Sequence, residues 1–187
     1  MQMFRSFLSV AMAIAVCSVA CAQMPEFPAP EKEHAFLKKF AGRWTTQSDC
    51  VMGPGLPPMK MTSTINARMI GEFWVVSEVN NSSMGKKVTA LQTIGFDATK
   101  KRYVGTWIDS MLGHLWHYTG SVDPTGQILT LEAEGPNFMT GKGTTIFRDI
   151  YEFKSDDHIL ATSLAKDENG KWVQFVTAHS KRQKDSE

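Results

Sequence analysis

From Gly42 onward, the chain alternates strand-length apolar segments with turn signals, and this pattern constrains the fold more than any other feature. Strong turn signals include Asp123-Pro124-Thr125-Gly126 and Asn169-Gly170. No helix-length apolar pattern interrupts the series, which excludes a parallel α/β sheet. The predicted strands are 44–50, 60–68, 73–80, 88–96, 102–109, 114–122, 127–134, 144–153, 159–164 and 171–180. This order predicts an all-β, antiparallel up-and-down barrel of about ten strands, because closure removes the exposed edges of a meander.

A short helix is predicted over residues 31–40, before the first strand. Glu31 and Glu33 lie in its first turn and two lysines in its last, which suits the helix dipole, and Gly42 follows its end. Residues 23–30 contain three prolines and are predicted to form an extended linker. We therefore expect a single barrel domain over 31–181, with a polar tail at 182–187.

The first 22 residues are typical of a cleaved export signal. Arg5 precedes an apolar run over 7–19, and Ala20-Cys21-Ala22 supplies the small residues expected before a cut at Gln23. The run is shorter than the roughly 20 residues that span a membrane. We therefore expect a periplasmic or extracellular protein. The alternative is lipidation of Cys21, which would place the protein on a membrane.

The composition excludes several classes of function. The formal net charge is +1 and the basic residues are scattered, so a nucleic-acid partner is not expected. Cys50 would be the only cysteine of the mature chain, so the domain must rest on its core rather than on a disulfide. The chain contains no nucleophile-elbow, zinc-protease, Cys-x-x-Cys or phosphate-loop motif, and no metal site is expected.

His114, Trp116 and Tyr118 alternate along one predicted strand and therefore share one face. If the turn at 123–126 is tight, Val122 opposes Gln127 on the next strand. The shared face then meets an apolar set on that strand, namely Leu129, Leu131 and Ala133. We expect this face to point into the barrel, where a histidine and two aromatic rings could hold a ligand or form part of a packed core.

Trp107 and Arg148 complete the candidate ligand site. Trp107 lies near the end of the preceding predicted strand, and Arg148 shares a face with Ile150 and Glu152. An inward Arg148 could hold a ligand carboxylate through two hydrogen bonds. The alternative is an ion pair with Glu152 or Asp149.

Several motifs, in this order along the chain, resemble the bacterial domain-of-unknown-function family numbered 1579. They are Gly42-Arg43-Trp44, Gly71-Glu72-Phe73-Trp74, Gly105-Thr106-Trp107, His114-Leu115-Trp116, Glu134-Gly135-Pro136 and Arg148-Asp149. The resemblance covers nearly all of residues 33–181. It implies a calycin-like barrel, related in shape to lipocalins, fatty-acid-binding proteins and nitrobindins, and it implies no activity. A haem role by analogy with nitrobindins would need a histidine inside the barrel, and the candidates are His114 and His179.

The sequence thus favours an exported barrel that binds a small, largely apolar molecule, and it leaves the ligand and any cofactor open. One alternative is an enzyme that uses the same cavity, with His114 and Asp109 as acid–base groups. Another is a filled barrel with a structural or interaction role.

Overall fold

The computed structural model describes residues 27–51, 53, 55–83 and 86–184. The predicted export signal, the cut before Gln23 and the lipidation alternative at Cys21 lie outside these residues. None of the helices in the described part of the chain is long and apolar enough to cross a membrane.

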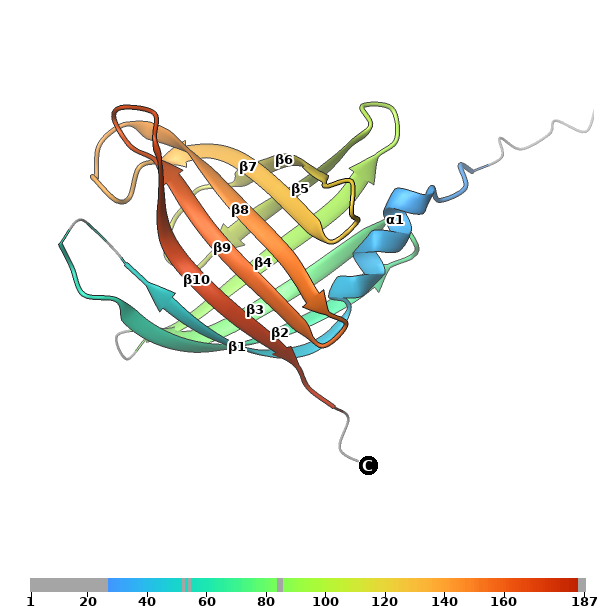
Figure 1. The fold of residues 1–187 in the computed structure, drawn as a ribbon, viewed down its shortest axis with the longest axis horizontal. Helices are drawn as coiled ribbons and strands as arrows, with labels where there is room; N and C mark the ends of the chain where they lie inside the picture. Colours follow the sequence, from blue (N-terminus) through green and yellow to red (C-terminus); the bar gives the residue numbers. More distant parts are fainter. Residues whose placement is uncertain (1–26, 52, 54, 84–85, 185–187) are drawn as a thin grey trace, which may run out of the picture.

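The described residues form one closed barrel of ten antiparallel strands preceded by a short helix (Figure 1). Each strand pairs with its neighbours in sequence, and β1 closes the barrel by pairing with β10. This confirms the predicted fold class. The elements are α1 (Lys32–Leu37), the 3₁₀ turn η1 (Lys38–Phe40), β1 (Gly42–Cys50), β2 (Met59–Ile70), β3 (Trp74–Ser83), β4 (Lys86–Asp97), β5 (Arg102–Asp109), β6 (Trp116–Val122), β7 (Ile128–Pro136), β8 (Thr144–Ser155), β9 (His158–Lys166) and β10 (Trp172–Arg182).

Two boundaries differ from the predicted ones in ways that affect the site. β6 begins at Trp116, so His114 precedes the strand. Arg182, which the sequence assigns to the polar tail, is the last residue of β10 and pairs with Trp44. It belongs to the barrel because its guanidinium stacks over the Trp44 ring at 4.1 Å.

The turn between β6 and β7 is longer than predicted. Val122 opposes Leu129 rather than Gln127, because the Asp123 carboxylate accepts hydrogen bonds from the backbone N–H groups of Gln127 and Ile128 and holds a wider turn. The register is therefore shifted by two residues. Since side chains alternate with a period of two, this shift leaves the predicted faces unchanged.

The helix covers one end of the barrel, which we call the helix end (Figure 1). Trp44 is 2% exposed, and its indole N–H donates to the Phe40 carbonyl at 2.8 Å. The helix is also tied to the strands by Tyr103, whose hydroxyl donates to the Glu33 carbonyl, and by Lys39, whose ammonium donates to the Gly126 carbonyl. Trp44 is therefore buried beside this helix. The opposite end, called the far end, carries the β1–β2, β3–β4, β5–β6, β7–β8 and β9–β10 connections.

Candidate functional site

The strand register decides which side chains point into the barrel, since residues opposite each other in an antiparallel pair share a face. Leu129 and Leu131 of β7 have no exposed surface and mark the inner face. Tyr151 and Asp149 of β8 lie opposite them and therefore also point inward. The same counting carries the inner face around all ten described strands.

The predicted aromatic residues meet at the far end of the barrel. Trp107 lies directly opposite Trp116, and both occupy inner positions. Trp116 and Tyr118 are buried. His114 packs edge-on against Trp116 with ring centroids 4.8 Å apart, and its Nε2 atom is buried without a hydrogen-bond partner. Four of the five predicted site residues, Trp107, His114, Trp116 and Tyr118, are thus brought to one region.

Three phenylalanines that the sequence analysis did not single out complete this region. Phe147 packs edge-on against Trp116, and Phe138 stacks on Phe147 at 5.0 Å. Phe175 contacts both phenylalanine rings. We call the whole set the far-end aromatic cluster; it comprises Trp107, His114, Trp116, Phe138, Phe147 and Phe175.

Arg148 points away from this interior, so the prediction that it lies inside as a charged anchor is wrong. Its neighbours in register are Glu132 and Leu164, which lie on the outer face. There Arg148 forms an ion pair with Glu132, and its guanidinium stacks over Trp172 at 3.9 Å. The alternation of β8 explains this placement. Phe147, Asp149 and Tyr151 occupy its inner positions, so the residue between Phe147 and Asp149 must face outward.

Asp149 is an interior polar residue that the sequence does not reveal as part of the site. Its carboxylate accepts hydrogen bonds from the Tyr118 hydroxyl at 2.6 Å and the Ser163 hydroxyl at 2.5 Å. Burial raises the pKa of Asp149 above its ordinary value, although both hydroxyls act to lower it. The pKa of Tyr118 is raised well above its ordinary value, first by burial and then by the Asp149 charge.

One hydrogen bond crosses the barrel interior between this region and the helix end. Gln92 of β4 donates to the Tyr151 hydroxyl of β8 at 2.8 Å. Tyr151 in turn packs edge-on against Phe40 beside the helix, with ring centroids 5.5 Å apart. The Gln92–Tyr151 bond therefore joins two walls of the barrel next to the packed core of the helix end.

Solvent reaches part of the inner wall on the far-end side of the Gln92–Tyr151 bond. Asp149, Tyr151 and Ser163 are partly exposed although they point into the barrel. Neighbouring inner positions on β1, β2, β9 and β10 are also partly exposed; they are Ser48, Met61, Ser63, Ala161 and Val176. Since these residues occupy inner positions of a closed barrel, their partial exposure indicates solvent-accessible space inside it. The interior is therefore not filled by its own side chains at this level.

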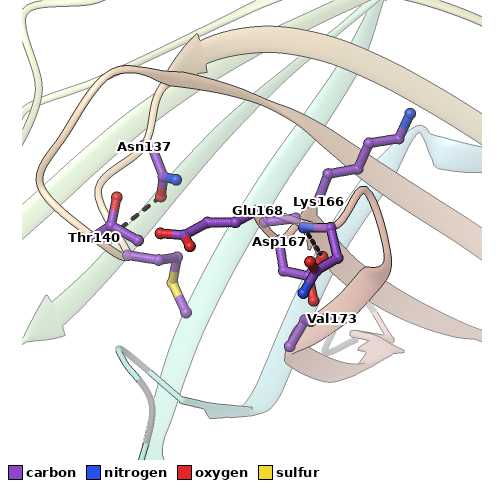
Figure 2. Close-up of a pocket in the computed structure, with 9 residues that line it drawn as sticks. Asn137, Thr140, Lys166, Asp167, Glu168 and Val173 are labelled. Carbon is purple, nitrogen blue, oxygen red and sulfur yellow. Dashed lines mark hydrogen bonds between the residues drawn. The ribbon is translucent and has the colours of Figure 1, made fainter.

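A pocket of ≈ 280 Å³ lies at the far end, between the β7–β8 connection and the β9–β10 turn. Figure 2 shows Glu168 extending from the β9–β10 turn toward Thr140 of the β7–β8 connection. The backbone N–H of Thr140 donates to the Asn137 side-chain oxygen at 3.3 Å. Ala165, whose register partner is the inward-facing Phe147, also lines this pocket. The pocket thus lies beside the far-end aromatic cluster.

The proposed acid–base pair is not formed. The Asp109 carboxylate accepts hydrogen bonds from the Trp107 indole, at 3.0 Å, and from the backbone N–H groups of Met111 and Leu112. Within the described residues, no hydrogen bond or ion pair joins His114 to Asp109. Asp109 therefore orders the strand end and the Trp107 ring in this structure.

His179 is not available as an interior haem ligand. It is exposed on the outer face of β10, opposite Gln47 and Leu160, and its Nδ1 lies 3.1 Å from His158 Nε2. The expectation that His179 could reach into the barrel is wrong, because its neighbours in the strand, Ala178 and Ser180, take the buried inner positions.

Comparison with known proteins supports the fold and gives no activity. The family model described as "Protein of unknown function (DUF1579)" matches residues 29–182. The structure of the S-type phycobiliprotein lyase CPES from Guillardia theta matches this chain with 14% sequence identity and a TM-score of 0.57. The match covers 85% of this chain and 100% of the lyase chain. The structure of Rv2717c from M. tuberculosis matches with 13% sequence identity and a TM-score of 0.63. That match covers 82% of this chain and 99% of the Rv2717c chain. No curated protein matches the chain.

Proposed function

The chain belongs to the DUF1579 family of proteins of unknown function. We propose that it is an exported protein whose barrel binds a small, largely apolar molecule. The observation that carries this proposal is the partly exposed inner wall around Asp149 and Ser163. A closed barrel with solvent-accessible interior space offers a ligand burial on nearly all sides.

The chemistry of the walls supports an apolar ligand. The far-end aromatic cluster offers large ring surfaces, and the helix end closes the opposite side with a packed core. Aromatic rings stack on planar or apolar groups, and the few interior polar groups can orient a single polar atom of the ligand. The structural neighbours add the same barrel shape and nothing about the ligand.

Filling the interior space provides a direct test. Ala161 is a small, partly exposed inner residue, and Thr162 beside it faces outward. We expect Ala161→Phe to weaken binding of the neutral fluorophore N-phenyl-1-naphthylamine by about tenfold or more, since the added ring occupies the ligand's space. Thr162→Phe adds the same ring outside and should leave binding unchanged. The readout is energy transfer from tryptophan to the bound fluorophore.

The filled-barrel alternative gives the opposite pattern. The unsubstituted protein would then bind no fluorophore, and Ala161→Phe would destabilise the fold by about 1–3 kcal/mol through overpacking. Native mass spectrometry of protein purified from its source is the complementary experiment. A retained small molecule would support the binding function and identify the ligand by mass.

A further inference from the structure

We infer that the bound molecule carries a positive charge, as an organic amine or similar cation attached to an apolar body, and that this charge pairs with Asp149. The inference rests on the proposed function, because it assigns the charge of the ligand that the barrel interior would take. Three features of the described residues carry it.

The first feature is the unused hydrogen-bonding capacity of the Asp149 carboxylate. An ionised carboxylate has about four acceptor positions, and the Tyr118 and Ser163 hydroxyls occupy two of them. Asp149 is also partly exposed, although it points into the barrel. Its remaining acceptor capacity is therefore accessible to a molecule in the interior space.

The second feature is the absence of a compensating cation among the described side chains. The described lysines and arginines on the strands face outward or lie at strand ends, and Arg182 is at the strand end nearest the helix. Arg182 is already engaged, because it stacks on Trp44 and donates to the backbone carbonyls of Ala41 and Lys39. Asp109 adds a second inner carboxylate, whose partners are likewise uncharged donors. A carboxylate charge that is largely removed from water and has no cationic partner is costly, so a cationic ligand would stabilise this interior.

The third feature is the far-end aromatic cluster. Trp107 and Trp116 lie opposite each other on the inner wall, and Phe147 packs beside Trp116. The faces of such rings attract cations, tryptophan most strongly. The two inner carboxylates are close to these rings. The Tyr118 hydroxyl donates to Asp149, the charge of Asp109 also raises the pKa of Tyr118, and Asp109 accepts a hydrogen bond from the Trp107 indole. The carboxylates and the rings thus favour the same sign of charge in a ligand.

A matched series of dodecyl compounds tests the inference. Dodecylammonium, dodecanol and dodecanoate share one apolar chain and differ in charge, so displacement of N-phenyl-1-naphthylamine by each compares charge alone. We expect dodecylammonium to bind about tenfold or more tightly than dodecanol, and dodecanoate to bind most weakly. Equal affinity for the three compounds, or a preference for dodecanoate, would overturn the inference.

Asp149→Asn gives the second measurement. The amide has the shape of the carboxylate, and the hydroxyls of Tyr118 and Ser163 can rotate to accommodate its N–H group. The variant should lose the preference for dodecylammonium while binding dodecanol as before. Glu152→Gln, which removes a carboxylate from the outer face of the same strand, should retain the preference. An equal loss in both variants would show that net charge, rather than Asp149, selects the cation.

The outcomes separate this inference from the function on which it rests. If neither the fluorophore nor any dodecyl compound binds, the proposed function fails and the inference fails with it. If the fluorophore and dodecanol bind without a preference for the cation, the binding function stands and the inference alone is wrong. Should Asp149→Asn fail to fold, the dodecyl series on the unsubstituted protein still decides the question.

Discussion

Removal of the Trp44 indole should destabilise the barrel more than loss of any exposed ring. Trp44 is 2% exposed and packs where β1, β10 and the helix meet. Truncating a buried tryptophan to alanine costs about 3–5 kcal/mol through lost burial and the cavity left behind. The substitution also leaves the Phe40 carbonyl without its indole donor, which costs about 1 kcal/mol.

Arg182 adds a further contribution. Its guanidinium lies 4.1 Å from the Trp44 ring centre and is about one quarter exposed, so this contact is worth about 1 kcal/mol. The contributions overlap, and we expect Trp44→Ala to cost about 5 kcal/mol in total. That is as large as the whole free energy of unfolding of a marginal domain. Trp44→Phe keeps most of the buried ring and should cost about 1–2 kcal/mol, chiefly the lost hydrogen bond.

Urea unfolding followed by far-ultraviolet circular dichroism provides the assay. Trp74→Ala is the matched control, because Trp74 is 40% exposed on the outer face and should cost much less. If Trp44→Ala and Trp74→Ala lower the midpoint equally, or if Trp44→Ala leaves it unchanged, the reasoning about this junction is wrong.

Three further predictions concern the interior, the sheet and the N-terminus. Burial raises the pKa of Asp149 above its ordinary 3.8. Protonated Asp149 therefore stabilises the folded protein fully below pH 3.8, and this contribution is lost as the pH rises through the folded-state pKa. Asp149→Asn should therefore raise the urea midpoint at neutral pH and change it little near about pH 3; a lower midpoint at neutral pH would contradict this. Gly105→Ala should destabilise the fold by about 1–3 kcal/mol in thermal unfolding, because a Cβ there would lie 2.0 Å from the Thr93 carbonyl oxygen; an unchanged melting temperature would contradict the tight packing. N-terminal sequencing of the exported protein should begin at Gln23, and a blocked, lipid-bearing Cys21 would refute that cut.

The architecture could be predicted because its signals are local. Turn residues and a period of two locate strands without knowledge of distant contacts. The error in the β6–β7 register was harmless for this reason, since a shift by two residues preserves the face on which Trp116 and Tyr118 lie. His114 lies beside Trp116 as predicted, although it precedes the strand rather than belonging to it.

The orientation of Arg148 could not be read as safely, because both faces of β8 contain apolar residues. Ile150 on the outer face resembles a core residue in sequence, while Asp149 interrupts the inner face. The overlooked signal was the alternation of Phe147, Tyr151 and Phe153, three large rings on one face of the strand. The partners of Asp149 and the crossing Gln92–Tyr151 bond depend on tertiary structure, so no local pattern reveals them.

The junction of β1 with β10 also has a consequence for how the chain acquires its structure. Ala41 and Arg182 are hydrogen-bonded across 141 positions of sequence, and β10, which closes the barrel, is synthesised after the other nine described strands. Until it arrives, β1 and β9 each present an unpaired edge, and closure must overcome the entropy of a very long loop. A chain truncated before Trp172 would keep both edges permanently and could satisfy them only by pairing with other chains, so nonsense products of this sequence should aggregate rather than remain monomeric.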